Sequence, residues 1–154
     1  MLRVIDRLIV KKPEIVAAKR TRINSINRSL VSSLSEKERW KCLNDLFREY
    51  RNFSMDTSLL IAREARKIAE HTDNDTMLWR SRLMEVEAHK GIGNYHKALA
   101  MLDSMPAGGK KAMRNDILNR YCSIYYSLYD NTFPRSDAEY YKKKQICYRD
   151  TLVK

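Results

Sequence analysis

Gly93-Asn94-Tyr95-His96-Lys97-Ala98-Leu99 is the stretch that carries the clearest structural signal in this sequence. Glycine commonly ends a helix and asparagine commonly caps the next one, so a new helix is predicted to begin after Asn94. Apolar side chains then follow at steps of three and four residues, as on one face of an α-helix. The buried side is predicted to comprise Tyr95, Ala98, Leu99 and Leu102.

The same pattern occurs 40 residues earlier in the chain. Here Leu43, Leu46, Ser58 and Leu59 correspond to Leu83, Val86, Ala98 and Leu99. Two helix pairs in one register indicate a repeat, because a pair that cannot bury its apolar face alone must stack on a neighbour. We predict that the packing between helices rests on Leu43, Leu46, Leu83, Val86, Tyr95, Ala98 and Leu102. A third copy would place Lys142 and Gln145 in apolar positions, so we expect an insertion before it.

Capping residues predict where other helices begin. Ser35 followed by Glu38 is a capping box, in which hydroxyl and carboxylate satisfy each other's free backbone N–H groups, so a helix is predicted from residue 36. Ser136 and Glu139 have the same spacing and predict a second box. Asp56 is expected to cap the helix that follows the first box. After Met105-Pro106, residues 107–109 (Ala-Gly-Gly) are predicted to form a turn.

Residues 1–34 are predicted to form a helical extension, and residues 35–154 the repeat domain. The residue before a proline is pushed away from helical geometry, so we expect a break or kink at Lys12 and a new helix from Pro13. Its apolar stripe comprises Ile15, Ile23, Ile26, Leu30 and Leu34. We expect this stripe to cap the repeat array, with a coiled-coil dimer as the alternative.

Composition narrows the possible classes of protein. An apolar fraction of 44% with 32% charged residues is typical of a soluble domain, and four glycines and three prolines are too few for the turns of a strand-rich fold. No stretch approaches the ~20 apolar residues of a membrane span. A formal charge of +11 permits weak, nonspecific contact with nucleic acids. The cysteines Cys42, Cys122 and Cys147 are expected to be buried free thiols.

The opening stretch, continued by Leu102 and Pro106, resembles the second helix of a tetratricopeptide repeat (TPR). There a glycine precedes an aromatic residue and a small residue follows it three positions later. More of the chain is similar to the TPR sensor region of bacterial transcriptional regulators, on the segments Lys19 to Leu34, Leu46-Phe47-Arg48-Glu49-Tyr50 and Phe53-Ser54-Met55-Asp56-Thr57-Ser58-Leu59.

The resemblance implies a fold and a context. The fold is an all-α, right-handed superhelix of about three stacked antiparallel helix pairs with an N-terminal helical extension. In the family, the repeats precede a membrane span and a C-terminal region that acts in transcription. The resemblance therefore implies that this chain is a fragment of a membrane-tethered regulator, with this region on the periplasmic side.

No group of catalytic, cofactor-binding or metal-binding residues emerges from the sequence. His71, His89 and His96 are expected at the surface or at helix ends, since none has the spacing of a helical metal site. Glu85 and Glu87 lie two residues apart and hence on different helix faces, so they cannot converge on one substrate. We therefore expect a protein that is not an enzyme and that binds no cofactor.

Tyrosines cluster in the C-terminal third, and their apolar rings with polar tips suit wet protein interfaces. The candidate contacts to a partner are Tyr121, Tyr125, Tyr129 and Tyr140, with simple repeat packing as the alternative interpretation. The leading hypothesis is a scaffold that binds a protein or peptide, because stacked repeats present extended grooves. The alternatives are a basic helical domain that binds nucleic acid and a dimerisation element built on residues 15–34.

Overall fold

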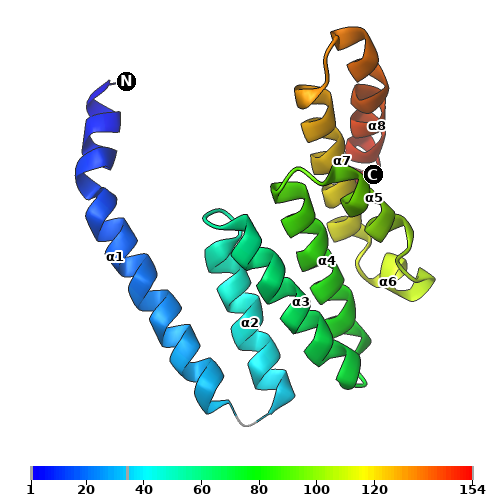
Figure 1. The fold of residues 1–154 in the computed structure, drawn as a ribbon. Coiled ribbons are helices and arrows are strands. Elements are labelled where there is room, and N and C mark those ends of the chain that lie inside the picture. Colours follow the sequence, from blue (N-terminus) through cyan, green and yellow to red (C-terminus); the bar gives the residue numbers. More distant parts are fainter. Residues whose placement is uncertain (1, 34, 154) are drawn as a thin grey trace.

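The computed structural model describes the backbone of residues 2–33 and 35–153, and the side chains of residues 12–33 and 35–153. Within these ranges the chain is helical and contains no strand, which confirms the predicted all-α class. The helices are arranged side by side from α1 at one end to the α7–α8 pair at the other (Figure 1). They are α1 (Leu2–Ser32), α2 (Glu36–Tyr50), α3 (Met55–His71), α4 (Asp75–Gly91), α5 (Tyr95–Asp103), α6 (Ala107–Ala112), α7 (Arg114–Asn131) and α8 (Arg135–Val153).

Three helix pairs repeat at nearly constant spacing. The first helices α2, α4 and α7 begin at residues 36, 75 and 114, each 39 residues after the one before, and α3, α5 and α8 begin at 55, 95 and 135, each 40 residues apart. Ser58, Ala98 and Ala138 occupy the same position in the second helices, and all three are fully buried. The third pair thus follows the predicted register, and the expected insertion is wrong.

Polar residues are tolerated in the third pair because of where it lies. Lys142 is exposed and Gln145 is half-buried, because no helix pair after α8 covers them in the described part of the chain. The equivalent positions in α3 lie between two pairs, where Ala62 and Ala65 are fully buried.

The segment after α5 differs from the predicted turn. Residues 107–109 begin the short helix α6, so α5 and α6 together match α3 in length, with the break at Pro106. A Cβ added to Gly109 would lie only 3.0 Å from the indole of Trp79. Gly109 therefore allows Trp79 to pack directly on the backbone of α6. The segment is helical because the Lys110 N–H donates to the Pro106 carbonyl at 2.9 Å, which starts the helical hydrogen bonding.

The first capping box is confirmed. The backbone N–H of Glu38 donates to the Ser35 hydroxyl at 3.2 Å, and the N–H of Ser35 donates to the Glu38 carboxylate at 3.2 Å. Two other caps were wrongly predicted. Ser54, with extended backbone, precedes α3, which places Asp56 in the first turn. Ser136 lies inside α8, because the Pro134 carbonyl accepts the N–H of residue 137 and starts the helix earlier.

Helix α1 runs without interruption through Pro13, so the break and the new helix expected there are wrong, and a kink at Lys12 stays a prediction. Proline removes one helical hydrogen bond and costs about 3 kcal/mol in a helix interior, which a long helix tolerates because the bonds on either side remain. The C-terminal half of α1 packs along α2 through Ile23, Ile26 and Leu30. Ile15 remains 55% exposed, and Leu34 lies outside the described residues.

Two hydrophobic clusters form the core, and α4 contributes to both. The first joins α1, α2, α3 and one side of α4, and the second joins the other side of α4 to α5, α7 and α8. A buried polar link crosses the first cluster. The Trp40 indole N–H donates to the Ser81 hydroxyl at 2.7 Å, and that hydroxyl donates to the Met77 carbonyl at 2.9 Å.

We predict that Ser81→Ala lowers the free energy of unfolding by about 1–3 kcal/mol, because it leaves the buried Trp40 N–H without an acceptor. Ser29 is a matched control, since its hydroxyl also donates to the carbonyl four residues earlier but is exposed. Ser29→Ala is expected to change stability by less than about 0.5 kcal/mol. Urea denaturation of both variants measures the difference, and equal losses would contradict a structural role for the Trp40–Ser81 bond.

Candidate functional site

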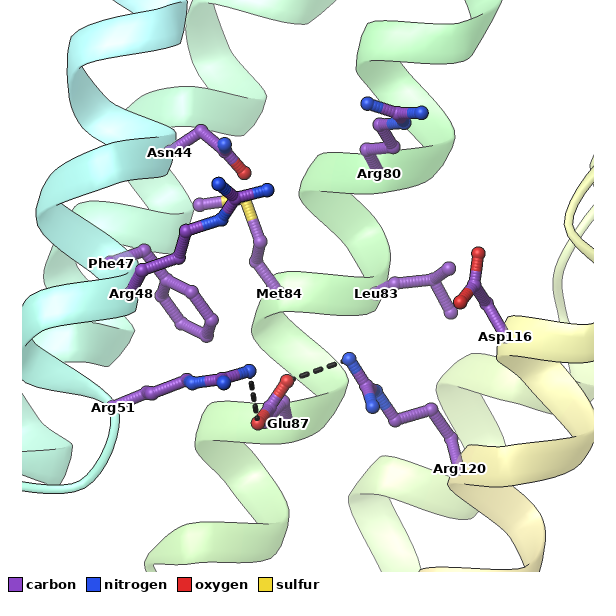
Figure 2. Close-up of a pocket in the computed structure, with 10 residues that line it drawn as sticks. All are labelled: Asn44, Phe47, Arg48, Arg51, Arg80, Leu83, Met84, Glu87, Asp116 and Arg120. Carbon is purple, nitrogen blue, oxygen red and sulfur yellow. Dashed lines mark hydrogen bonds and ion pairs between the residues drawn. The ribbon is translucent and has the colours of Figure 1, made fainter.

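The first helices of the three pairs share a pocket of about 260 Å³, here called the central pocket. Figure 2 shows its side chains converging from α2, α4 and α7. Its apolar lining consists of Phe47, Leu83 and Met84, and its cations are Arg48, Arg51, Arg80 and Arg120. Within each helix the lining residues recur at steps of three, four or seven, which places them on one face.

A carboxylate on the middle helix ties the three helices together. Glu87 of α4 lies 3.4 Å from the guanidinium of Arg51, the residue directly after α2, and 2.6 Å from that of Arg120 of α7. Figure 2 shows this bridge closing one end of the pocket. Because these groups are only partly exposed and come from three helices, the bridge also fixes the positions of the two arginines on opposite walls.

The other two arginines are less engaged. Arg80 makes no ion pair with any residue that the structure describes, and Arg48 reaches only Asp45 of its own helix, at 3.8 Å between exposed groups. Exposed pairs of this kind contribute little to stability. Asp116 of α7 is the second carboxylate in the lining, so four arginines face two carboxylates and the pocket is positively charged.

Sequence reasoning did not single out the central pocket. The four arginines stand at residues 48, 51, 80 and 120, so no local pattern of the sequence brings them together. The spacing of these residues is nevertheless periodic, since Asn44, Arg48 and Arg51 repeat at steps of four and three and Arg80 and Glu87 lie seven apart. Such spacing places each set on one face of its helix. It indicates a shared pocket only when the helices are aligned by the repeat register.

The tyrosine cluster lies between α7 and α8. Tyr121 stacks on Tyr148 with ring centroids 4.5 Å apart, and Tyr125 stacks on the same ring at 5.6 Å. The Tyr121 hydroxyl donates to Asp103 of α5. Tyr121 is only 8% exposed, whereas Tyr140 is 58% exposed.

The environment of the stack favours neutral phenols. Burial raises the pKa of Tyr125 to about 12, and burial together with the hydrogen bond to Asp103 raises the pKa of Tyr121. Tyr129 lies outside the stack, with the Arg135 guanidinium 5.3 Å from its ring centroid. The structure therefore gathers Tyr121 and Tyr125 in the interior of the third pair and leaves Tyr140 at the surface.

The predicted packing residues lie in the two clusters. Leu43 and Leu46 of α2 belong to the first, and Tyr95 is half-buried against the second. The other predicted packing residues belong to the second cluster and are each at most 5% exposed: Leu83, Val86, Ala98 and Leu102.

The remaining chemistry-bearing residues form no centre. His89 lies in the last turn of α4, which confirms the expected helix-end position. It is only 3% exposed, and burial, with Lys97 and Arg63 nearby, lowers its pKa. The three cysteines are not fully buried as expected, since Cys42 and Cys122 are half-buried and Cys147 is exposed. Among the described residues α8 packs on α7 alone, which leaves Cys147 on an uncovered side of α8. Among the side chains that the structure describes (residues 12–33 and 35–153), no three His, Cys, Asp or Glu residues gather as metal ligands.

Two further expectations concern charge and hydropathy. Glu85 contacts Arg66 of α3 whereas Glu87 faces the central pocket, which confirms that these two carboxylates lie on different faces of α4. None of the helices in the described part of the chain combines the length and apolar character that crossing a membrane requires.

Comparison with known proteins supports one family. Neither the comparison with curated proteins nor that with solved structures gives a match. A family model described as the SusR N-terminal TPR domain matches residues 9–154, which is nearly the whole chain. This match agrees with the repeated helix pairs and confirms the resemblance to a TPR sensor region. The chain therefore belongs to the SusR N-terminal TPR domain family.

Proposed function

We propose that this chain is a protein-interaction scaffold whose central pocket receives a segment of a partner protein. Stacked TPR helix pairs suit such a role, because they present an extended face to a partner. The observation that carries the proposal is that Glu87 holds Arg51 and Arg120 on opposite walls, so the pocket is formed before any partner arrives. Preorganised side chains lose less conformational entropy on binding.

The wider context of the scaffold is also part of the proposal. Family membership and the segments that resemble bacterial sensor regions support a role as the N-terminal part of a transcriptional regulator. In that role the domain passes on a signal by binding a partner protein and performs no catalysis. Helix α1 is proposed as the cap of the array, since Ile23 is 8% exposed against α2 and the Arg22 guanidinium lies 3.1 Å from Glu49.

We predict that a photo-crosslinking residue placed at Asn44, in the central pocket, forms adducts with a partner protein in cells. The same residue at His96, which is exposed on α5, is the control and is expected to give none. Gel shifts and mass spectrometry measure the adducts. Adducts of equal yield from both positions, or none from Asn44, would contradict partner binding through this pocket.

A further inference from the structure

We propose that the segment held in the central pocket is an extended, acidic peptide stretch whose carboxylates pair with Arg48 and Arg80. This inference rests on the proposed function and adds the chemistry of the partner to it. Charge complementarity is its starting point, since four arginines face only two carboxylates and one of these, Glu87, is already engaged.

The arginines have unused hydrogen-bonding capacity. A guanidinium carries five N–H donors, and Glu87 uses only part of those on Arg51 and Arg120. The Nε atom of Arg120 is buried and has no hydrogen-bond partner. Arg80 has no ion-pair partner among the described residues. A ligand that supplies oxygen acceptors to this pocket would satisfy donors that the protein itself leaves free.

The shape and lining of the pocket favour side-chain carboxylates over larger anions. A volume of about 260 Å³ is small for a cofactor and admits one or two side chains. Phe47, Leu83 and Met84 suit the aliphatic part of a glutamate or a neighbouring apolar side chain. A carboxylate accepts two parallel hydrogen bonds from a guanidinium, and one carboxylate for each of Arg48 and Arg80 would offset the positive charge by which the arginines of the pocket exceed its carboxylates.

The test uses fluorescein-labelled peptides of about ten residues, which span roughly 33 Å when extended. One alternates Glu with Ala, one alternates Gln with Ala, and one alternates phosphoserine with Ala. Fluorescence anisotropy at near-physiological salt measures their binding to the parent chain. The Glu peptide is expected to bind at least about tenfold more tightly than the Gln peptide, because charged hydrogen bonds are the stronger ones.

A pair of double variants separates the pocket from the overall charge. R48Q/R80Q is expected to weaken binding of the Glu peptide by about tenfold or more. K111Q/K143Q, on exposed positions of α6 and α8, is expected to change the affinity for the same peptide by less than about twofold. Both variants remove the same formal charge. Equal weakening by both would overturn the proposal, because it would show general attraction to a chain of formal charge +11.

Other outcomes also decide the question. Equal binding of the Gln peptide would overturn the proposal in favour of an apolar contact, and tighter binding of the phosphoserine peptide would overturn it in favour of a phosphorylated partner. The crosslinking experiment at Asn44 tests partner binding by itself, independently of whether the bound segment is acidic. An adduct that persists in R48Q/R80Q leaves partner binding intact and overturns the acidic segment alone.

Discussion

Leu102→Ala is expected to lower the free energy of unfolding by about 2–5 kcal/mol. Leu102 is fully buried in the second hydrophobic cluster, where α5 packs between α4 and α7. Alanine would remove the buried methyl groups and leave a cavity, and the neighbouring helices are held by their own pairs and cannot collapse into it. Urea denaturation followed by circular dichroism at the helical wavelengths measures the change.

The chain offers a matched control for this substitution. Leu60 lies on α3 and is 63% exposed, so Leu60→Ala removes the same atoms without opening a cavity. Its effect is expected to stay within about 0.5 kcal/mol. Similar losses for Leu102→Ala and Leu60→Ala would mean that α5 does not pack between α4 and α7 as described.

Arg66→Met is expected to be the second strongly destabilising change, with a loss of about 3 kcal/mol. The Glu85 side chain is 5% exposed, and its carboxylate lies 2.5 Å from the Arg66 guanidinium, although the N–H does not align with the oxygen as a hydrogen bond. Removing the arginine leaves a buried negative charge without a counter-ion. Arg66 is 38% exposed, so solvent screening places the loss at the lower end of the range for buried pairs.

A double variant tests the cause of that loss. Arg66→Met combined with Glu85→Met is expected to recover most of the stability, because it replaces both charges with apolar groups of similar volume. The exposed pair of Lys67 and Glu64 is the control, and Lys67→Met is expected to cost at most about 1 kcal/mol. If the double variant is less stable than Arg66→Met, packing and not the unpaired charge explains the effect.

Local signals in the sequence predicted most of the helices. Asn94 and the glycines around it mark the start of α5, and Ser35 with Glu38 marks the start of α2, because caps and turns act within a few residues. The same local reasoning misplaced the break at Pro13. A proline penalty can be stated from the sequence, but whether the helix continues depends on the hydrogen bonds on both sides of it.

The third helix pair keeps the repeat register although its sequence no longer resembles that of the first two pairs. Ala138 is fully buried like Ala98, yet the following positions carry Lys142 and Gln145, so the sequence suggested an insertion. Burial at those positions depends on a neighbouring pair. Among the described residues α8 packs on α7 alone, so Lys142 and Gln145 are not enclosed and the apolar pattern on which the prediction relied is absent there.

Local patterns in the sequence establish the all-α class, the antiparallel pairs and the 40-residue repeat, because helix periodicity and capping depend on residues close together in the chain. The position of the central pocket follows from the stacking of the helices instead. Arg51 at the end of α2, Glu87 of α4 and Arg120 of α7 come within contact distance only when these three helices stack. Such contacts depend on the angle and spacing between helices, which are set by how buried side chains pack, and no local pattern records them.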